Sequence, residues 1–119
     1  MHYTMVNLSM NAKKAITPEV GMCGTYFGLN DRYPVVCTEV KSPKHVVIVF
    51  LYEGDIEKMV TDENGIMRLP EEEMAKHEHA TREAYSLRKN GAWVREGSNM
   101  YNGGSVLFGE ADYYYCREI

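Results

Sequence analysis

The stretch HVVIVFLY, residues 45–52, decides the fold of this chain. Apolar side chains fill successive positions from Val46 to Tyr52, so both faces of an extended strand would be apolar. Valine, isoleucine and aromatic residues favour strands, and a strand that is apolar on both faces lies centrally in its fold. We therefore predict that other elements, or another subunit, cover this strand and that the hydrophobic core lies around it.

The residues before this strand predict its neighbours. VVCTEV at 35–40 is rich in β-branched residues, and the intervening KSPK contains Pro43, which favours a turn. These two runs are expected to form a hairpin. Residues 20–26 alternate with the period of two that is typical of a pleated strand, and turn-forming residues follow at 28–31.

The residues after it predict one short helix. Pro70 is followed by three glutamates, and proline suits the first helical position while carboxylates suit the positive end of the helix dipole. We expect a helix over 70–80 and a strand from about residue 82. Asn64-Gly65 predicts a further turn, because both residues tolerate positive φ.

The end of the chain contributes two short strands or one bent strand, at 105–108 and 113–116. Together these patterns predict an α+β fold, a mainly antiparallel β-sheet with one short helix near 70–80. A length of 119 residues fits a single domain, 1–119, with residues 1–18 as an edge strand or a partner-binding arm.

Composition narrows the function classes. Hydrophobic residues make up 45% and charged residues 25%, which is typical of a globular protein, and no run approaches the roughly 18 apolar residues needed to span a bilayer. A net charge of −4 argues against binding a nucleic acid polymer through a broad basic surface. The amino terminus lacks a secretory pattern, so a cytoplasmic location is expected.

Motifs for catalysis are missing from the sequence. There is no GxSxG, HExxH or P-loop pattern, and we assign no catalytic residue and no cofactor. His77 and His79 stand two positions apart, which is a poor spacing for a metal on a helix, so no metal site is assigned. Three cysteines without a CxxC pair indicate free thiols, with Cys37 and Cys116 packed rather than nucleophilic.

The strongest hairpin signature in the chain is Asn90-Gly91. If these residues form a two-residue turn, antiparallel counting pairs Arg88 with Trp93 and Leu87 with Val94. Leu87 and Val94 then face the core. The opposite face carries Ser86, Arg88, Trp93 and Arg95.

That second face is a predicted ligand surface. An indole beside two guanidinium groups can stack a base and bind phosphate oxygens. The alternative is that Arg88 and Arg95 only cover the exposed side of Trp93 through cation–π contact. Of the terminal tyrosines 113–115, at least one ring, such as Tyr113, could enter a pocket, and an inter-subunit contact is the other use.

Three motifs resemble a known group of proteins. VGMCGTYFGLNDRYPVVCTEV at 20–40, SLRKNGAWV at 86–94 and VLFGEADYYY at 106–115 together are similar to the first-described Thoeris anti-defence family of phage. Members are sponges for cyclic ADP-ribose isomers made by bacterial TIR-domain sensors. The resemblance implies a non-enzymatic protein in the host bacterial cytoplasm that encloses glycocyclic ADP-ribose between subunits of a homo-oligomer, a dimer or hexamer, and some members also hold cyclic oligonucleotides.

The resemblance implies further site residues. Tyr85 matches an aromatic ring placed against adenine, and Arg32 in NDRYP matches an arginine placed against the pyrophosphate. The sequence departs from the family pattern after Gly109, where residues 110–112 read Glu-Ala-Asp and an arginine is expected. Because hairpin counting puts Tyr85 opposite Trp93, both would line one site only if subunits combine. The predicted ligand-binding residues are Arg32, Tyr85, Arg88, Trp93, Arg95 and Tyr113.

Two other classes of function remain open at this point. One is a small SH3-like β-barrel interaction module of phage origin that grips a partner protein through Trp93 and the tyrosines. The other is an enzyme that uses His77, His79 and nearby glutamates around a metal. Affinity for nucleotides separates the first class from a sponge, and turnover of the ligand separates the second.

Overall fold

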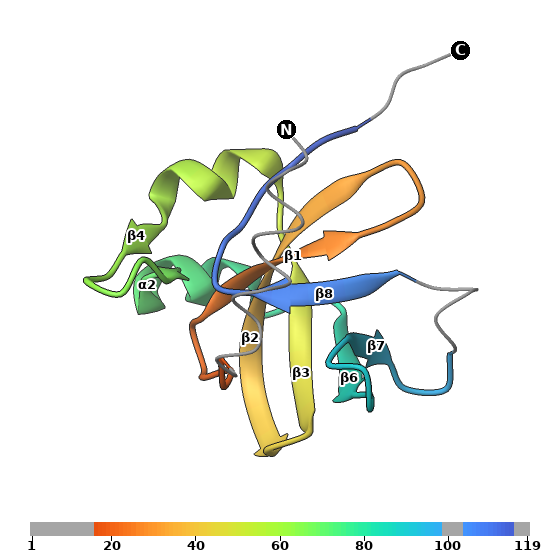
Figure 1. The fold of residues 1–119 in the computed structure, drawn as a ribbon. Helices are drawn as coiled ribbons and strands as arrows, with labels where there is room; N and C mark the ends of the chain where they lie inside the picture. The colour runs from red at the N-terminus through yellow and green to blue at the C-terminus, as the bar shows by residue number, and fades with distance from the viewer. Residues whose placement is uncertain (1–15, 99–103, 116–119) are drawn as a thin grey trace.

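Six antiparallel strands close into a barrel (Figure 1). The computed structural model describes residues 16–98 and 104–115. Strands pair in the order β1, β2, β3, β6, β7, β8, and β8 pairs with β1 to complete the circle. The prediction of a mainly antiparallel β fold is confirmed. The barrel strands are β1 (Cys23–Phe27), β2 (Arg32–Ser42), β3 (His45–Phe50), β6 (Arg82–Leu87), β7 (Trp93–Arg95) and β8 (Ser105–Phe108).

Strand β3 has apolar side chains on both faces, as HVVIVFLY predicts. Val46 and Ile48 point into the barrel and belong to the cluster that fills it. Val49, and Leu51 just after the strand, belong to a second cluster on the outside of the barrel wall. The predicted covering of both faces is confirmed, and other segments of the same chain supply it.

The hairpin of β2 and β3, which turns at residues 43–44, is also confirmed. The strand predicted over 20–26 begins later than expected. The backbone N–H of Met22 donates to the carbonyl of Glu19 at 2.9 Å and closes a turn there. For this reason β1 begins only at Cys23.

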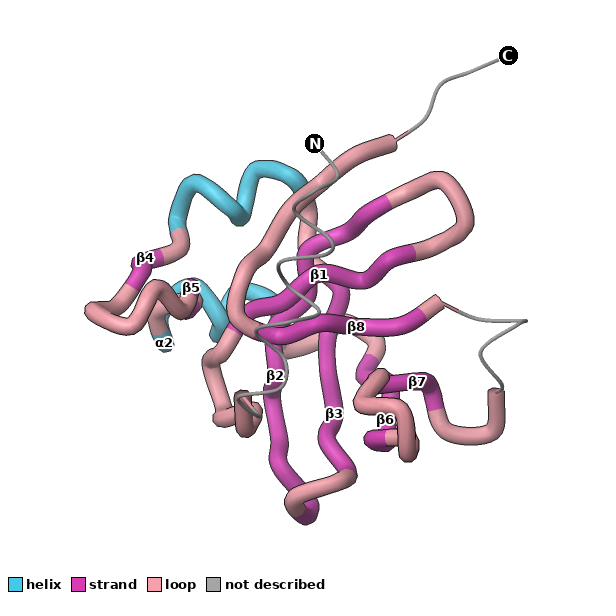
Figure 2. Tube along the Cα trace, viewed as in Figure 1, coloured by secondary structure: helices cyan, strands magenta, loops and turns pink. Residues whose placement is uncertain are grey.

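Between β3 and β6 the chain leaves the barrel and packs over the outer side of its wall. Figure 2 shows the helical parts of this excursion on one side of the barrel. Leu69 is buried there, and Met74 packs against the same outer cluster. The elements of the excursion are η2 (Glu53–Lys58), β4 (Val60–Thr61), β5 (Met67–Arg68), α2 (Glu71–Met74) and η3 (Ala75–His77).

The helix predicted over 70–80 is shorter than expected. The α-helix α2 has four residues after Pro70, and the chain continues as the 3₁₀ turn η3. Met74 and Ala80 are the residues of this segment that pack on the outer cluster. A helix with so narrow an apolar contact gains little from tertiary packing, which is the main source of helix stability. None of the described helices is long and apolar enough to cross a membrane.

The hairpin of β6 and β7 turns through three residues, so the predicted two-residue turn is wrong. The N–H of Arg88 donates to the carbonyl of Ala92 at 2.8 Å, and the N–H of Gly91 donates to the carbonyl of Arg88 at 2.9 Å. Gly91 has φ +90°, the left-handed conformation that ends a three-residue loop. Leu87 therefore pairs with Trp93, one residue away from the predicted register. A slip of one residue exchanges the two faces of a strand, and Trp93 lies inside the barrel.

The other Asn-Gly site has the same hydrogen-bond pattern. The N–H of Asp62 donates to the carbonyl of Ile66 at 2.9 Å, and the N–H of Gly65 donates to the carbonyl of Asp62 at 3.0 Å. The Asp62 carboxylate also accepts from the N–H groups of Asn64 and Ile66 and from the Nε of Arg68. These hydrogen bonds, first that of Ile66, lower the pKa of Asp62.

The end of the chain agrees with prediction in part. Strand β8 coincides with the expected strand at 105–108. The strand expected at 113–116 reduces, within the described residues, to one antiparallel bridge between Arg32 and Tyr114. Residues 1–15 of the predicted edge strand or arm, and Cys116, lie outside the described residues.

The two ends of the barrel interior differ in chemistry. At one end, the apolar end, Trp93 and Phe108 pack edge to face with ring centroids 5.7 Å apart, beside Met22 and Leu87. Ile66, from the Asp62–Ile66 loop, packs against the same cluster. The opposite end, the cavity end, is where β1 finishes and β2 begins, and tyrosines replace the aliphatic residues there.

Candidate ligand-binding site

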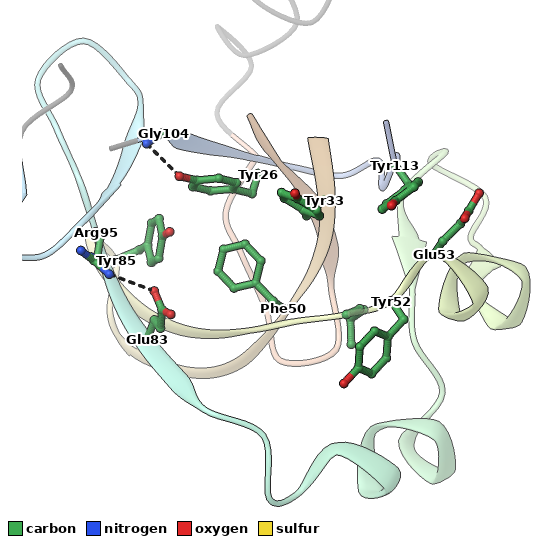
Figure 3. Close-up of a pocket in the computed structure, with 11 residues that line it drawn as sticks. Tyr26, Tyr33, Phe50, Tyr52, Glu53, Glu83, Tyr85, Arg95, Gly104 and Tyr113 are labelled. Carbon is green, nitrogen blue, oxygen red and sulfur yellow. Dashed lines mark hydrogen bonds and ion pairs between the residues drawn. The ribbon is translucent and has the colours of Figure 1, made fainter. Parts of the chain in front are cut away.

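A cavity of about 610 Å³ opens at the cavity end of the barrel (Figure 3). Its lining is dominated by the rings of Tyr26, Tyr33, Phe50, Tyr85 and Tyr113, and Tyr52 borders it with a ring that points outward toward His77. Three charged side chains join them, Glu53, Glu83 and Arg95. Pockets of this size, mostly apolar and with few polar groups, are typical of small-molecule sites.

Strand alternation explains why these rings share one cavity. Tyr26 and Tyr33 are paired residues of β1 and β2, so both rings project to the same face. Tyr85 and Arg95 are paired in the same way between β6 and β7. In a barrel, the inward positions of all strands converge, so residues distant in sequence meet at its mouth.

The rings support one another through edge contacts. Tyr26 and Phe50 lie 5.1 Å apart between ring centroids, and Tyr33 lies 5.9 Å from Tyr113, both in edge-to-face geometry. The Tyr26 hydroxyl accepts the N–H of Gly104 at 3.1 Å. A Cβ at position 104 would come within 2.7 Å of the Tyr26 ring, so only glycine allows this approach.

One wall of the cavity carries a loose ion pair. Arg95 Nη1 lies 3.7 Å from Glu83 Oε1, which is too long for a hydrogen bond. The Arg95 side chain is 58% exposed and that of Glu83 is 28% exposed. Burial, and after it the Glu83 charge, raises the pKa of Tyr85. Its hydroxyl therefore stays protonated at neutral pH and can donate a hydrogen bond.

The structure brings together Tyr85, Arg95 and Tyr113 among the predicted site residues, since all three line this cavity. Tyr85 and Arg95 meet within one chain, so this pair of site residues needs no second subunit. The prediction that Trp93 belongs to a ligand surface is wrong. Its side chain is 5% exposed at the apolar end and offers no surface on which a base could stack. The three-residue loop explains this placement, because it turns the indole inward.

Arg88 does not line the cavity, and its guanidinium donates hydrogen bonds to its own chain. Its Nη2 donates to the carbonyls of Ser98 at 2.9 Å and Arg95 at 3.3 Å, and its Nε donates to Ser86 Oγ at 3.3 Å. Arg88 thus ties the segment that follows β7 back to the hairpin. It does not cover Trp93 by cation–π contact.

Arg32 lies beside the cavity without lining it. Its Nη1 binds Asp112 Oδ2 at 3.0 Å, and its guanidinium carbon lies 5.5 Å from the Phe27 ring centroid. Asp112 belongs to the segment in which the family pattern has an arginine. Where the resemblance predicts an arginine, this chain therefore has a carboxylate that pairs with Arg32. That carboxylate offsets the positive charge that was expected to contact a pyrophosphate.

Sequence reasoning missed much of the aromatic lining. Tyr26, Tyr33 and Phe50 lie in strands or at strand ends that were predicted, but their inward direction was not assigned. A usable signal was present, because Tyr26 and Tyr33 flank the 28–31 turn. Residues equidistant from a hairpin turn share a face.

Histidines and cysteines occupy other surroundings. His77 Nε2 lies 3.3 Å from Asp55 Oδ1, and the His79 side chain is 92% exposed. Within residues 16–98 and 104–115, no group of three or more His, Cys, Asp or Glu could hold a metal. Burial raises the pKa of the Cys23 thiol to about 12 and that of Cys37 to about 11, so both stay protonated at neutral pH.

Fold and site together define a small antiparallel β-barrel with an aromatic cavity at one end of its interior. Comparison with family models, with curated proteins and with solved structures finds no significant match to this chain. The likeness to phage anti-defence proteins therefore rests on the three sequence motifs alone. The residues that line the cavity are the basis for inferring the chemistry of its ligand.

Proposed function

We propose that this protein binds a cyclic ADP-ribose-type nucleotide, such as glycocyclic ADP-ribose, and holds it without degrading it, so that Thoeris signalling is blocked. The observation that carries the proposal is the cavity of about 610 Å³ lined by the rings of Tyr26, Tyr33, Phe50, Tyr85 and Tyr113. Aromatic side chains stack on nucleobases with about 1 to 3 kcal/mol per base. The volume is within the range of cavities that enclose nucleotide-sized ligands.

The charges favour one orientation of such a ligand. Arg95 is the exposed cation of the cavity and can form charge-assisted hydrogen bonds to a phosphate. Arg32 precedes Tyr33 in β2, but Asp112 already binds its Nη1 and offsets its charge, so Arg95 is the better phosphate contact. The base therefore enters among the rings, and the pyrophosphate stays at the mouth of the barrel.

Exposed tyrosines at the same end support assembly with a second copy. Tyr52 is 75% exposed, Tyr114 is 54% exposed and Tyr115 is 51% exposed. Tyrosine is enriched at protein interfaces because it combines apolar area with a polar tip. A homo-oligomer joined there would close the cavity over the ligand.

The test is calorimetry of the purified protein with cyclic ADP-ribose isomers, followed by heating of the complex and mass analysis of what is released. Saturable binding and release of the intact ligand are expected. Release of an altered ligand would indicate an enzyme instead. Absence of heat with every isomer would contradict the proposal.

A second candidate function is favoured by the exposed tyrosines of the cavity end, which could grip a partner protein. In this reading the small barrel is an interaction module. Its contacts would come from Tyr52, Tyr114 and Tyr115 and not from the buried Trp93. Binding of a partner by a chain that ignores all nucleotides would favour this alternative.

A further inference from the structure

Glu83 differs from the other shielded carboxylates of the described chain. Asp62 accepts three hydrogen bonds, and Asp55 accepts the N–H of Tyr52 at 2.8 Å and contacts His77. Glu83 is 28% exposed, close to the 27% of Asp62, and its contact in the described residues is Arg95 at 3.7 Å. Its oxygens therefore keep their capacity to accept hydrogen bonds.

Glu83 lies in the cavity wall, so its oxygens can accept hydrogen bonds from a ligand in the cavity. It is an inward-facing residue of β6, paired with Ile48 of β3, and Tyr85 is the next inward residue along the strand. Figure 3 shows its carboxylate beside Tyr85 and Arg95 at one side of the ring-lined space. A carboxylate held among aromatic rings is costly unless it is paired or hydrogen-bonded.

We propose that Glu83 selects the ring that enters the cavity by accepting hydrogen bonds from its exocyclic amino group, so that an amino-substituted ring such as 6-aminopurine is preferred over its 6-oxo counterpart. This inference rests on the proposed function and adds the identity of the group that reads the base. An ionised carboxylate only accepts hydrogen bonds, so it complements an amino group and repels a ring carbonyl.

The neighbouring groups fit the same reading. Arg95 only donates hydrogen bonds, so the pair presents an acceptor and a donor side by side on β6 and β7. A ring of the cavity wall, such as that of Tyr26 or Phe50, can stack on a planar ring without regard to its substituents. Stacking therefore supplies affinity, and Glu83 supplies discrimination.

The experiment compares Glu83→Gln with the wild type against two pairs of ligands. The pairs are a cyclic ADP-ribose isomer with its inosine counterpart, and adenosine with inosine, all measured by calorimetry. The wild type should bind the amino member at least about 10-fold more tightly, because the exocyclic amino group donates to the carboxylate at the position where the oxo member presents a carbonyl oxygen that the carboxylate repels.

In Glu83→Gln the preference should fall by about 10-fold or more, and affinity for the inosine ligands should rise, because the glutamine amide can donate to a ring carbonyl. A merely structural effect would lower both affinities together. Glu39→Gln is the matched control, since Glu39 is an exposed carboxylate of the barrel strand β2 and does not line the cavity. It should leave the preference unchanged, and thermal melting verifies that both variants fold.

The outcomes separate the two proposals. If the wild type binds cyclic ADP-ribose isomers but does not distinguish amino from oxo rings, the role of Glu83 is overturned and the proposed function stands. An equal loss of both affinities in Glu83→Gln has the same meaning. If neither pair of ligands binds the wild type, both proposals fail together.

Discussion

The two ends of the barrel interior are built on the same six strands and differ in what their inward side chains do. At the apolar end Trp93, Phe108 and Met22 are buried and satisfy one another by close packing. At the cavity end Tyr26, Phe50 and the other aromatic residues leave about 610 Å³ open, with Glu83 and Arg95 in the wall. The first end stabilises the fold, and the second keeps surface available for a ligand.

The largest effect is expected from Trp93→Ala at the apolar end. Removal of a buried indole leaves a cavity, so the free energy of unfolding should fall by about 3 to 5 kcal/mol. Urea unfolding followed by circular dichroism measures this change. Trp93→Phe should lose much less, and a small loss in Trp93→Ala would show that this end contributes little to the fold.

At the cavity end, Arg95→Ala should lower ligand affinity and leave the stability of the fold almost unchanged. The side chain is 58% exposed, so unfolding should change little, whereas binding of a cyclic ADP-ribose isomer should weaken by about 1.5 to 3 kcal/mol if it makes a charge-assisted hydrogen bond. Calorimetry measures the affinity.

Arg88→Ala is the matched control for that variant. It removes an arginine that binds carbonyls of its own chain, so it should destabilise the protein while leaving affinity unchanged. Equal losses of affinity in Arg88→Ala and Arg95→Ala would remove the distinction between the two arginines.

A smaller effect is expected from Tyr26→Phe, which removes the hydroxyl that accepts the Gly104 N–H but keeps the ring in the cavity wall. The free energy of unfolding should fall by about 1 kcal/mol. Hydrogen exchange at the Gly104 amide should become faster. An unchanged exchange rate would indicate that this hydrogen bond does not fix the start of β8.

The smallest effect concerns pH and the loop beside the apolar end. The pKa of Asp62 is lowered in the fold, so its contribution to stability is present above its ordinary value of 3.8 and is lost as pH falls through the lowered pKa. Asp62→Ala should be less stable than the wild type at pH 7, and the difference should shrink in acid. Unfolding curves at pH 7 and in steps below pH 4 measure it, and ligand affinity at pH 7 should not change.

The sequence predicted the strands better than it predicted their faces. Apolar runs and their alternation located β2, β3 and β6, because those signals come from the burial of the strands themselves. The face of Trp93 depends on whether Asn90-Gly91 makes a two-residue or a three-residue turn, and both turns use the same residue types. The predicted ligand surface was wrong because the loop is one residue longer than predicted, which turns Trp93 to the other face of its strand.

The candidate site was predictable only in part for a related reason. Tyr85, Arg95 and Tyr113 could be named singly, but a closed barrel brings β1, β6 and the chain end together, and sequence spacing does not encode that convergence. The Arg32–Asp112 pair likewise joins segments 80 positions apart. Local patterns carry no information on such a contact.

The position of the one tryptophan has a spectroscopic consequence. Trp93 lies at the apolar end, whereas Phe50 and four tyrosine rings line the cavity, so tryptophan and these tyrosines report on different ends of the barrel. Indole emission should report the integrity of the barrel. Tyrosine absorbance and emission should instead respond to whatever enters the cavity, and one titration can then follow folding and occupancy in separate wavelength windows.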